Sequence, residues 1–525
     1  MKIGFVTYSG IDDLKEWEHG LFTRLKSEYR DTFISIIQLK ERRSFSNKSL
    51  WKNLIIRNQL KLEKKLIDVR NNFKFIPDSH INATNVDQHK TPDSNLINLL
   101  RNQDLDVVIN LSDNEDIALL LSSYSKNGVL QFVYRGESLF RCYNIIGVRE
   151  LLNKEPTIKI ELVQYSKDYH MPLVVDYACY NIHWSSYKNY VFILCSLDSL
   201  IVRNLIKERI NGTCDKKEKN ADSVSVGDFF VYYYNFYGNI LKKYISQTFN
   251  KLFKYHREKW SVYIGKNNIF DESLDSIIPI RSPKNEFWAD PFLYKWGNEL
   301  YLFFERYPFK NLKGRISCAK IFNGRAHEVK DVLIRDYHLS YPFIFEECGN
   351  IFMIPETSEN MRLEVYKCTK FPDKWELYST AFEGESLADS VYFVDEDDQK
   401  WFFTNKSNNR FRDHCTELYI YKIDSLGFNS IKHHKQNPVI INSSTARNGG
   451  GFFVKNNNLY RVSQNNSYGI YGYSVWINQV KTLSLEEYIE IPVKEIKPTF
   501  DKGLVGVHHM HQIEDFFVID GCSKQ

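Results

Sequence analysis

The pattern of hydrophobic and polar residues changes once along the chain, near residue 260. Before that point, short apolar runs alternate with longer segments of helical spacing, the first over residues 12–30 and a more polar one over about 49–71. The apolar runs are continuous, as in strands buried on both faces; they are KIGFVTYSG (2–10), TFISIIQL (32–39), LDVVINLS (105–112) and GVLQFVY (128–134). This alternation predicts an open α/β sheet over residues 1–205.

Residues 206–260 have the character of a linker. The segment starts polar, with DKKEKNADS from Asp215, and continues into an aromatic run over 229–260. Apolar residues recur in that run at helical spacing, which predicts an amphipathic helix; they are Phe229, Tyr232, Tyr233, Phe236, Ile240, Tyr244, Phe249 and Phe253. Two interpretations stay open: a connecting helix packed between domains, and a helix that lies on a membrane surface, where lysines and aromatic residues occur together.

After Trp260 the chain consists of short apolar-aromatic strands separated by turns of Gly, Asn or Asp. Five units repeat this pattern, and each opens on a polar or aromatic residue; these residues are Asp290, Tyr341, Asp389, Arg447 and His508, at spacings of 51, 48, 58 and 61. Five similar β units at a period of about 50 residues predict a five-bladed β-propeller over 261–525, with one unit per blade. A β-sandwich would have similar strands but would not explain the residues recurring at one offset.

Composition and charge exclude several classes of protein. The 525 residues are 43% hydrophobic and 26% charged, as expected for a globular protein of two or three domains. A net charge of +4, from 69 basic and 65 acidic residues, gives no support to binding of a nucleic acid polymer. No apolar run reaches about 18 residues, so no transmembrane segment is predicted. The start, MKIGFVTYSG, lacks the features of a signal peptide. Nine cysteines without a CxxC pair predict reduced thiols in a cytoplasmic protein.

The innermost strand of each propeller blade lines the central channel, so the opening residues are expected to converge although they are far apart in sequence. Residues at the ends of the second strands add Glu305, Glu356 and Gln464 to the set. Carboxylates, an arginine, a histidine and aromatic rings together suit a sugar, because carboxylates bind hydroxyls or act as acid and base, and rings stack on sugar faces.

Three of these residues also have local interpretations. Asp290 precedes Pro291 and could cap a turn. Glu356 follows an apolar run, where a buried carboxylate without a partner would be costly, so a partner or a ligand is expected. Arg447 stands beside the glycines of NGGG (448–451), which permit a close approach of backbone to a ligand.

The cluster His508, His509 and His511 raises the question of a metal site. In a strand, alternate residues face opposite sides, so His509 and His511 share one face and His508 lies on the other. Three ligands on one side are therefore not available, and no metal is expected here.

The C-terminal half contains WADPF (288–292), YPFIFEECGNIFMIPET (341–357), FPDKWE (371–376), NPV (437–439), ARNGG (446–450), LYRVSQ (459–464), YG (471–472) and GVHHMH…VIDG (506–521). In these motifs and their order it resembles, over about 265 residues, the five-bladed propeller at the N-terminus of plant glucosamine inositolphosphorylceramide transferases, which also occurs in bacterial surface-polysaccharide loci. The resemblance implies a propeller that acts on carbohydrate.

The same architecture is similar to glycoside hydrolases of the arabinanase, levansucrase and invertase type. In those enzymes the carboxylate that opens the inner strand of the first blade is a base or nucleophile, and the resemblance implies that role for Asp290. The hydrolases also have an aspartate that opens the second blade, where this sequence has Tyr341. The departure argues against ordinary glycoside hydrolysis.

The N-terminal half resembles, through LDVVINLS, NGVLQFVYRGE and NKEPTIKIELVQYS, a formyltransferase domain of the methionyl-tRNA and sugar-nucleotide type. That family uses an Asn-x-His pair, which aligns here with Gln131 and Val133. Valine cannot exchange protons, so the resemblance implies a degenerate domain without formyl transfer. The fold places ligands at strand ends, and the residues expected there to bind a donor are Tyr8, Ser9, Gly10, Asn110, Arg135 and Glu137.

The function expected from these observations is carbohydrate transfer of the glycosyltransferase type, in capsule, other surface polysaccharide or glycolipid biosynthesis. The propeller would hold the carbohydrate acceptor, the α/β domain would hold a nucleotide-activated donor, and the sequence names no cofactor. Expected roles are base or ligand for Asp290, acid, base or hydroxyl binding for Glu356 and Asp389, and substrate contacts for Glu305, Tyr341, Arg447, Gln464 and His508. The alternatives are a noncatalytic glycan-binding scaffold and a glycoside hydrolase.

Overall fold

The computed structural model describes residues 1–9, 14–29, 31–39, 58–59, 61–65, 81–86, 102–168, 171–206, 224–253, 258–270, 274, 277–407 and 409–524. The chain divides into two compact units, residues 1–239 and 240–525. The polar helix expected over 49–71 falls mostly outside the described residues, but 58–59 and 61–65 are helical. In the described part of the chain, none of the helices has both the length and the apolar character needed to cross a membrane.

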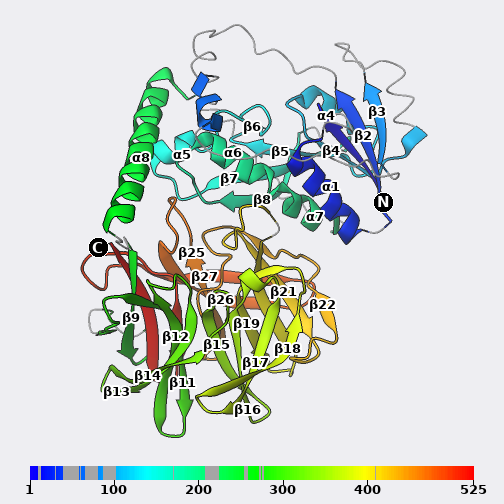
Figure 1. Ribbon diagram of the computed structural model, residues 1–525. Coiled ribbons are helices and arrows are strands. Elements are labelled where there is room, and N and C mark those ends of the chain that lie inside the picture. The colour runs from blue at the N-terminus through cyan, green and yellow to red at the C-terminus, as the bar shows by residue number, and fades with distance from the viewer. Residues whose placement is uncertain are drawn as a thin grey trace. The chain divides into compact units, whose positions relative to one another are not determined.

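The first unit is built on a mixed sheet with strand order β3-β2-β1-β4-β5-β7-β8, in which β6 pairs with β5 (Figure 1). Pairing is parallel from β3 to β5 and antiparallel from β5 to β8. Strands β4 and β5 are buried along their whole length, which explains their continuous apolar sequence. The strands are β1 (Lys2–Thr7), β2 (Phe33–Leu39), β3 (Ile81–Val86), β4 (Val107–Asn110), β5 (Val129–Tyr134), β6 (Glu137–Ser138), β7 (Ile158–Tyr165) and β8 (Leu173–Tyr180). An open α/β sheet is therefore present, and its likeness to formyltransferases stays a prediction.

The named helices of this unit are α1 (Glu16–Glu28), α4 (Glu115–Leu121), α5 (Val148–Asn153), α6 (Ser186–Leu194), α7 (Leu197–Ile206) and the start of α8 (Val226–Phe253). Side-chain oxygens cap two of them: Asn114 accepts backbone N–H groups at the start of α4, and Ser185 does so at the start of α6. Helix α8 packs on the unit through Tyr232, whose hydroxyl donates to Glu63 Oε1 at 2.9 Å and accepts from the Ser186 backbone N–H at 2.7 Å.

The amphipathic helix expected over 229–260 ends earlier than predicted. Helix α8 ends at Phe253, and Glu258 already begins strand β9 (Glu258–Lys266). Trp260, the last residue of the aromatic run, pairs with Cys522 in the propeller. Aromatic residues suit both helix faces and strands, so the composition of the run did not mark this boundary.

The second unit is a five-bladed β-propeller, which confirms the prediction from the repeat. Four blades are consecutive sheets in chain order. They comprise β11 (Glu286–Trp296), β12 (Glu299–Pro308), β13 (Arg315–Phe322) and β14 (Arg325–Leu333); β15 (Ser340–Glu347), β16 (Asn350–Glu356), β17 (Leu363–Lys370) and β18 (Lys374–Ala381); β19 (Ser386–Val394), β20 (Lys400–Ser407), β21 (Glu417–Ile423), β22 (Ile431–His433) and β23 (Ile440–Ile441); and β24 (Phe453–Lys455), β25 (Asn458–Asn465), β26 (Ser474–Leu483) and β27 (Tyr488–Ile496).

The fifth blade joins both ends of the propeller sequence. Strand β9 pairs antiparallel with β30 (Phe516–Lys524) over nine residue pairs, from Lys266–Phe516 to Glu258–Lys524. The red C-terminal strand accordingly lies beside green β9 in Figure 1. The sheet is completed by β10 (Ile278–Ile280), β28 (Leu504–Gly506) and β29 (Met510–Ile513). The last sequence unit is therefore only part of a blade, and residues from the start of the propeller complete it.

A shared backbone irregularity shows that three of the five opening residues are equivalent. Asp290, Tyr341 and Asp389 have φ angles of 50°, 45° and 45°, and each lies at a register shift between the first two strands of its blade. A β-bulge of this kind re-aims the side chain of the extra residue. Arg447 and His508 instead precede the short inner strands β24 and β29.

Candidate active site

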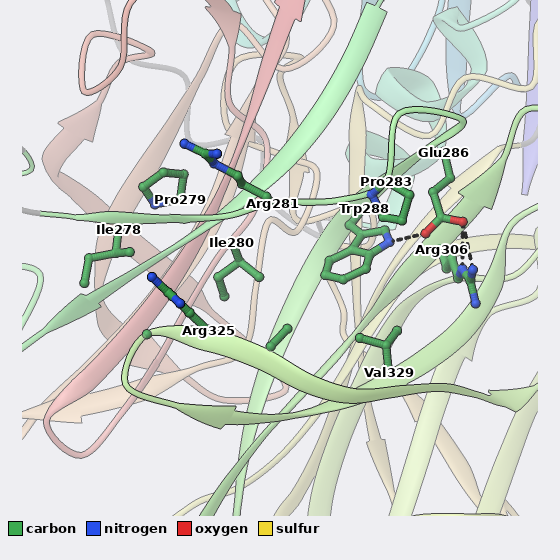
Figure 2. A pocket seen from close by; sticks show the side chains of 12 residues that line it. Ile278, Pro279, Ile280, Arg281, Pro283, Glu286, Trp288, Arg306, Arg325 and Val329 are labelled. Atoms are coloured by element: carbon green, nitrogen blue, oxygen red, sulfur yellow. Dashed lines mark hydrogen bonds and ion pairs between the residues drawn. The ribbon is translucent and has the colours of Figure 1, made fainter.

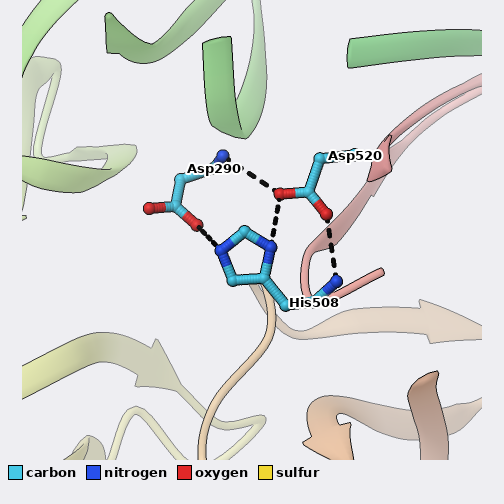
Figure 3. Close-up of side chains that lie close together, drawn as sticks. All are labelled: Asp290, His508 and Asp520. Carbon is cyan, nitrogen blue, oxygen red and sulfur yellow. Dashed lines mark hydrogen bonds and ion pairs between the residues drawn. The ribbon is translucent and has the colours of Figure 1, made fainter. Parts of the chain in front are cut away.

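The centre of the site is a histidine between two carboxylates. His508 Nε2 lies 3.2 Å from Asp290 Oδ1, and His508 Nδ1 lies 2.7 Å from Asp520 Oδ2 (Figure 3). Asp520 also accepts hydrogen bonds from three backbone N–H groups, those of Asp290 at 3.3 Å and of His508 and His509 at 3.0 Å each. The last strand of the propeller therefore fixes both the imidazole and the bulge that carries Asp290.

This arrangement sets opposite charges on its members. Burial opposes a charge on His508, but the charges of Asp520 and Asp290 outweigh it and raise the pKa of His508 to about 10. Burial likewise acts to raise the pKa of Asp290, yet the charge and hydrogen bond of His508 lower it to about 2. Asp290 is therefore an ionised carboxylate and His508 an imidazolium at neutral pH.

A second cluster joins Arg447 to two carboxylates from other blades. Arg447 Nε donates to Asp389 Oδ2 at 2.6 Å, and Arg447 Nη2 donates to Glu356 Oε2 at 3.3 Å. Gln464 Nε2 donates to Asp389 Oδ2 at 2.8 Å. Burial raises the pKa of Asp389 to about 7, although the charge of Arg447 acts in the opposite direction. The structure thus brings together four residues that lie 17 to 108 positions apart in the sequence.

Glu305 lies beside a histidine that the sequence analysis did not select. His338 Nε2 is 3.4 Å from Glu305 Oε1, and His338 Nδ1 accepts the backbone N–H of Gly314 at 2.9 Å. Only glycine fits at 314, because a Cβ there would stand 2.6 Å from Glu305 Oε1. Burial lowers the pKa of His338, so this imidazole is neutral. Burial, reinforced by the negative charge of Asp290, raises the pKa of Glu305 well above its ordinary value.

Two carboxyl groups of the site therefore have their pKa values moved in opposite directions. Asp290 is held ionised and Glu305 is held protonated, and the charge of the first is one cause of the neutrality of the second. Such a pair can supply a base and an acid to one reaction at neutral pH. The sequence offered both residues but could not assign the protonated state to Glu305.

Aromatic rings pack against the two histidines that lie beside Asp290 and Glu305. The Trp260 ring centroid lies 4.0 Å from that of His508, and Tyr471 lies 5.5 Å from His508. On the Glu305 side, Tyr307 packs 6.0 Å from His338 and stacks on Phe287 at 4.6 Å with an interplanar angle of 4°. Tyr471 is half exposed, and the Arg447 guanidinium lies over its ring, 5.4 Å from the centroid, so only the exposed part of the ring can contact a sugar.

The side chain of Tyr341, which was predicted to contact substrate, lies inside the propeller core. Its side chain is fully buried, and its hydroxyl exchanges two hydrogen bonds with Gly450, accepting from the N–H at 3.0 Å and donating to the C=O at 2.9 Å. Its ring packs on Phe292 and His509. The side chain therefore joins two blades, while the backbone N–H donates to Asp290 Oδ2 at 3.1 Å.

Three residues at the centre of the site are possible metal ligands. Among the described residues, Asp290, His508 and Asp520 have ligand atoms within 4.8 Å of one another. In the protonated state given above, both ring nitrogens of His508 carry a proton and form ion pairs with carboxylates, so a cation would have to displace a proton from the imidazole. His509 and His511 instead pack against Phe292, and burial lowers the pKa of both.

The residues expected to bind a donor lie in the first unit, and most have internal partners. Tyr8 donates to Asp113, and Asn110 accepts from both N and Oγ of Ser112. Arg135 pairs with Glu150 at 3.1 Å and Glu155 at 2.6 Å. Ser9 is buried beyond the end of β1, Glu137 begins β6, and Gly10 lies outside the described residues. A donor site at these residues stays a prediction.

Asp520 and His338 are the main residues of the site that sequence reasoning missed. Asp520 had a signal: it follows the apolar run FFVI (516–519), where a carboxylate requires a partner, the same argument that selected Glu356. His338 had none, because it lies in a loop between two blades and outside the repeated motif.

The comparisons with known proteins concern the propeller. Residues 273–512 match the family model described as "Glucosamine inositolphosphorylceramide transferase 1, N-terminal". The resemblance predicted for the propeller is confirmed. Glucosamine inositolphosphorylceramide transferase 1 from Oryza sativa subsp. indica is 36% identical over 216 residues, and that from Arabidopsis thaliana is 35% identical over 222 residues. Each match covers 40% of this chain, and the chain spans about 28% of the length of these curated relatives.

Among solved structures, the chain is similar to a GH43 beta-xylosidase/alpha-arabinofuranosidase from a compost microbial metagenome, with 11% identity, a TM-score of 0.32, and coverage of 46% of this chain and 92% of that chain. It is also similar to an exo-beta-1,3-galactanase from Clostridium thermocellum, with 11% identity, a TM-score of 0.34, and coverage of 49% and 58%. At this identity and TM-score the likeness carries no argument about chemistry.

Proposed function

We propose that the propeller binds a carbohydrate and takes part in its transfer, as a glycosyltransferase-type enzyme of surface polysaccharide or glycolipid biosynthesis. The observation that carries this proposal is the pair of carboxyl groups with opposite protonation, Asp290 ionised and Glu305 neutral. The relatives matched by this propeller are named as transferases, which supports transfer over the other uses of an acid and a base.

In the proposed mechanism, Asp290 accepts the proton of an acceptor hydroxyl as that oxygen attacks the anomeric carbon of the donor. Glu305 donates its proton to the leaving oxygen, and its high pKa ensures that the proton is present at neutral pH. His508 and Asp520 orient the base, and Arg447 attracts an anionic group on one of the substrates. Tyr471 and Trp260 supply ring faces against which a sugar stacks. A nucleotide-activated donor and a cytoplasmic location complete this proposal.

A noncatalytic glycan-binding scaffold is the second candidate, and one observation favours it. Arg447 already neutralises Asp389 and Glu356, and all three side chains are at most 12% exposed. A closed ion-pair cluster of this kind holds three blades together without any chemistry. Glycoside hydrolysis finds less support, since Tyr341 occupies the position where the hydrolases have an aspartate.

The test is a thermal-shift screen of the full chain against nucleotide sugars and oligosaccharides, followed by a transfer assay with the compounds that stabilise it. A ligand at a hundred times its dissociation constant adds about 2.7 kcal/mol to the free energy of unfolding, which moves the midpoint visibly. Asp290→Asn should abolish transfer in a protein that still folds, because the amide oxygen still accepts the Tyr341 N–H, while loss of the ion pair with His508 should lower the midpoint. Asp397→Asn, in an exposed hairpin turn, is the control.

Three outcomes separate the candidates. Retained transfer in Asp290→Asn would overturn the assigned base. Stabilisation by glycans alone, with no product from any nucleotide sugar, would leave the scaffold. Release of reducing sugar from an oligosaccharide without a donor would make the protein a hydrolase.

A further inference from the structure

The long helix α8 (Figure 1) has apolar side chains on two sides. On one side Phe229, Tyr232 and Phe236 are at most 3% exposed and pack within the first unit. On another side, seven large apolar side chains are 45–81% exposed; they are Phe230, Val231, Tyr234, Tyr237, Leu241, Tyr244 and Ile245. A helix that packs on its own domain needs one apolar stripe, so the second stripe requires another explanation.

Exposed apolar side chains on the propeller are arranged differently. Ile278 borders a pocket of about 700 Å³, whose buried floor includes Ile280 and Trp288 (Figure 2). At one end of that pocket Glu286 accepts from Trp288 Nε1 at 2.8 Å and from Arg306 Nε at 2.9 Å. The apolar groups of the propeller thus line a hollow, whereas those of α8 project from the side of a helix. A projecting stripe suits contact with another surface.

Five of the exposed side chains of α8 form a regular row. They are Phe230, Tyr234, Tyr237, Leu241 and Tyr244, at alternating spacings of four and three residues. This spacing keeps side chains on one side of a helix, and it is the pattern of the a and d positions of a coiled coil. The row extends for about 21 Å along the helix axis. Its spacing predicts a partner helix that lies along α8.

The charges near the row favour a protein partner over a lipid surface. Between Phe230 and Ile245 the sequence has two charged residues, Lys242 and Lys243. At about 100° of rotation per residue, both lie roughly 110° or more around the helix from the middle of the row. Over residues 229–236 the opposite side of α8 packs within the first unit. That stretch therefore does not present the solvated, cation-rich face of a helix that lies on a membrane.

The row is complementary to itself. When two α8 helices meet antiparallel with Tyr237 at the two-fold axis, Phe230 faces the partner's Tyr244. In the same register Tyr234 faces the partner's Leu241, so a larger side chain meets a smaller one. No charged residue belongs to the row, so association brings no like charges together. A two-fold interface requires this kind of self-complementarity, because both copies contribute the same surface.

The exposed area is close to what a stable dimer needs. Aromatic side chains have about 150–250 Å² of surface each, so the exposed parts of the four aromatic residues amount to about 500 Å² for each copy. Val231, Leu241 and Ile245 extend this surface. A stable interface buries about 800 Å² on each partner. Tyrosine and phenylalanine are also enriched at the centres of interfaces.

We propose that the exposed row of α8 is a dimer interface, through which two copies of this chain associate with their α8 helices antiparallel about a two-fold axis at Tyr237. The spacing of the row, its self-complementarity and its exposed area carry the proposal. It is independent of the proposed function, because it uses none of the residues of the candidate active site.

The first experiment measures the mass of the full chain by light scattering and its association by sedimentation velocity, between 1 and 50 μM. Wild type should have twice the mass of one chain. Tyr234→Glu should raise the dissociation constant at least tenfold, because the two-fold axis brings two new carboxylates into one apolar interface. Asn235→Glu is the matched control, since it adds the same charge at the next exposed position, outside the row. That control should leave the dissociation constant unchanged.

The second experiment tests the antiparallel register and does not depend on the folding of Tyr234→Glu. Tyr237→Cys should form a disulfide-linked dimer on mild oxidation, because the two copies of this position meet at the axis. Asn235→Cys, two residues away and outside the row, should not. Wild type measures the background from the exposed Cys348.

Four results would overturn the proposal. The first is a wild-type protein with the mass of a single chain at 50 μM, and the second is a dimer that Tyr234→Glu does not weaken. The third is equal cross-linking of Tyr237→Cys and Asn235→Cys. The fourth is co-sedimentation of a monomeric wild type with vesicles of phosphatidylcholine and phosphatidylserine, lost in Tyr234→Glu, which would assign the row to a lipid surface.

Discussion

The backbone N–H of Tyr341 donates a hydrogen bond to Asp290 Oδ2, so the opening residue of one blade positions the carboxylate of the blade before it. Both residues lie in β-bulges with positive φ, a conformation that costs of order 1 kcal/mol for a residue with a side chain. Strain of this kind is retained where a structure over-determines it, as it does here through the bond between the two bulges.

The hydroxyl of Tyr341 should matter for stability and not for activity. Tyr341→Phe leaves the N–H and C=O of Gly450 without their partner in a buried place, which should cost about 1–3 kcal/mol of the free energy of unfolding. Urea denaturation measures this loss. Tyr294→Phe is the control, because its hydroxyl bonds to Glu346 at the surface and its removal should cost less than about 0.5 kcal/mol. Equal losses in the two variants would contradict the role of Tyr341 as a link between blades.

Glu305→Gln should remove turnover at little cost in stability. Glutamine has the shape and the neutral charge of a protonated glutamate but has no acidic proton to donate. Because the folded protein holds more protons at Glu305 than the unfolded chain does, the carboxyl destabilises the fold as pH rises, and the variant should be more stable than wild type at pH 8. Transfer assays and urea denaturation at pH 5 and pH 8 measure both effects. A variant that transfers sugar at the wild-type rate would show that Glu305 is not the acid.

Arg447→Met should be strongly destabilising, because it leaves Asp389 and Glu356 buried without their cation. Breaking a buried pair in this way costs about 3–5 kcal/mol. Without Arg447 the pKa of Asp389 should rise beyond about 7, so the loss of stability should be smaller at pH 5, where the carboxyl is protonated, than at pH 8. In a double-mutant cycle Asp389→Asn should recover much of the loss. Additive losses would show that the two residues do not act as a pair.

His508 should make stability depend on pH in the alkaline range. Its folded pKa of about 10 lies above the ordinary value of 6.5, so the folded state binds more protons and the contribution is complete below pH 6.5. The contribution is then lost toward pH 10, by up to about 1.4 kcal/mol for each pH unit. The difference in unfolding free energy between wild type and His508→Gln should therefore shrink from pH 6.5 to pH 10. If the difference in unfolding free energy between wild type and His508→Gln stays constant from pH 6.5 to pH 10, the pKa of His508 is not raised in the folded protein.

The repeat in the sequence was sufficient to predict the propeller and the equivalence of Asp290, Tyr341 and Asp389, which share a bulge at one offset. It also grouped Arg447 and His508 with them, and these two instead precede the short strands β24 and β29. It could not predict the pairing of Arg447 with Asp389 and Glu356. Those residues belong to three different blades, and only the curvature of the ring determines which side chains meet. The protonation of Glu305 could not be predicted from the sequence either, since it depends on burial and on the charge of Asp290.

The secondary structure at Trp260 was also not predictable from the local sequence pattern. It ends a run of aromatic residues at helical spacing, so the sequence placed it in a helix, whereas it lies in β9 and packs against His508. Its strand is determined by pairing with β30, more than 250 residues later, and local pattern carries no information about such a partner.

The pairing of β9 with β30 has a consequence for how the protein is made. Asp290 and Glu305 leave the ribosome early in the synthesis of the propeller, but His508 and Asp520 are among its last residues. Until β30 docks, the ring remains open and Asp290 lacks the imidazolium that keeps it charged. A chain that ends before residue 504 would contain the four blades from β11 to β27 but neither His508 nor Asp520. The proposed acid and base pair therefore requires closure of the ring by β30.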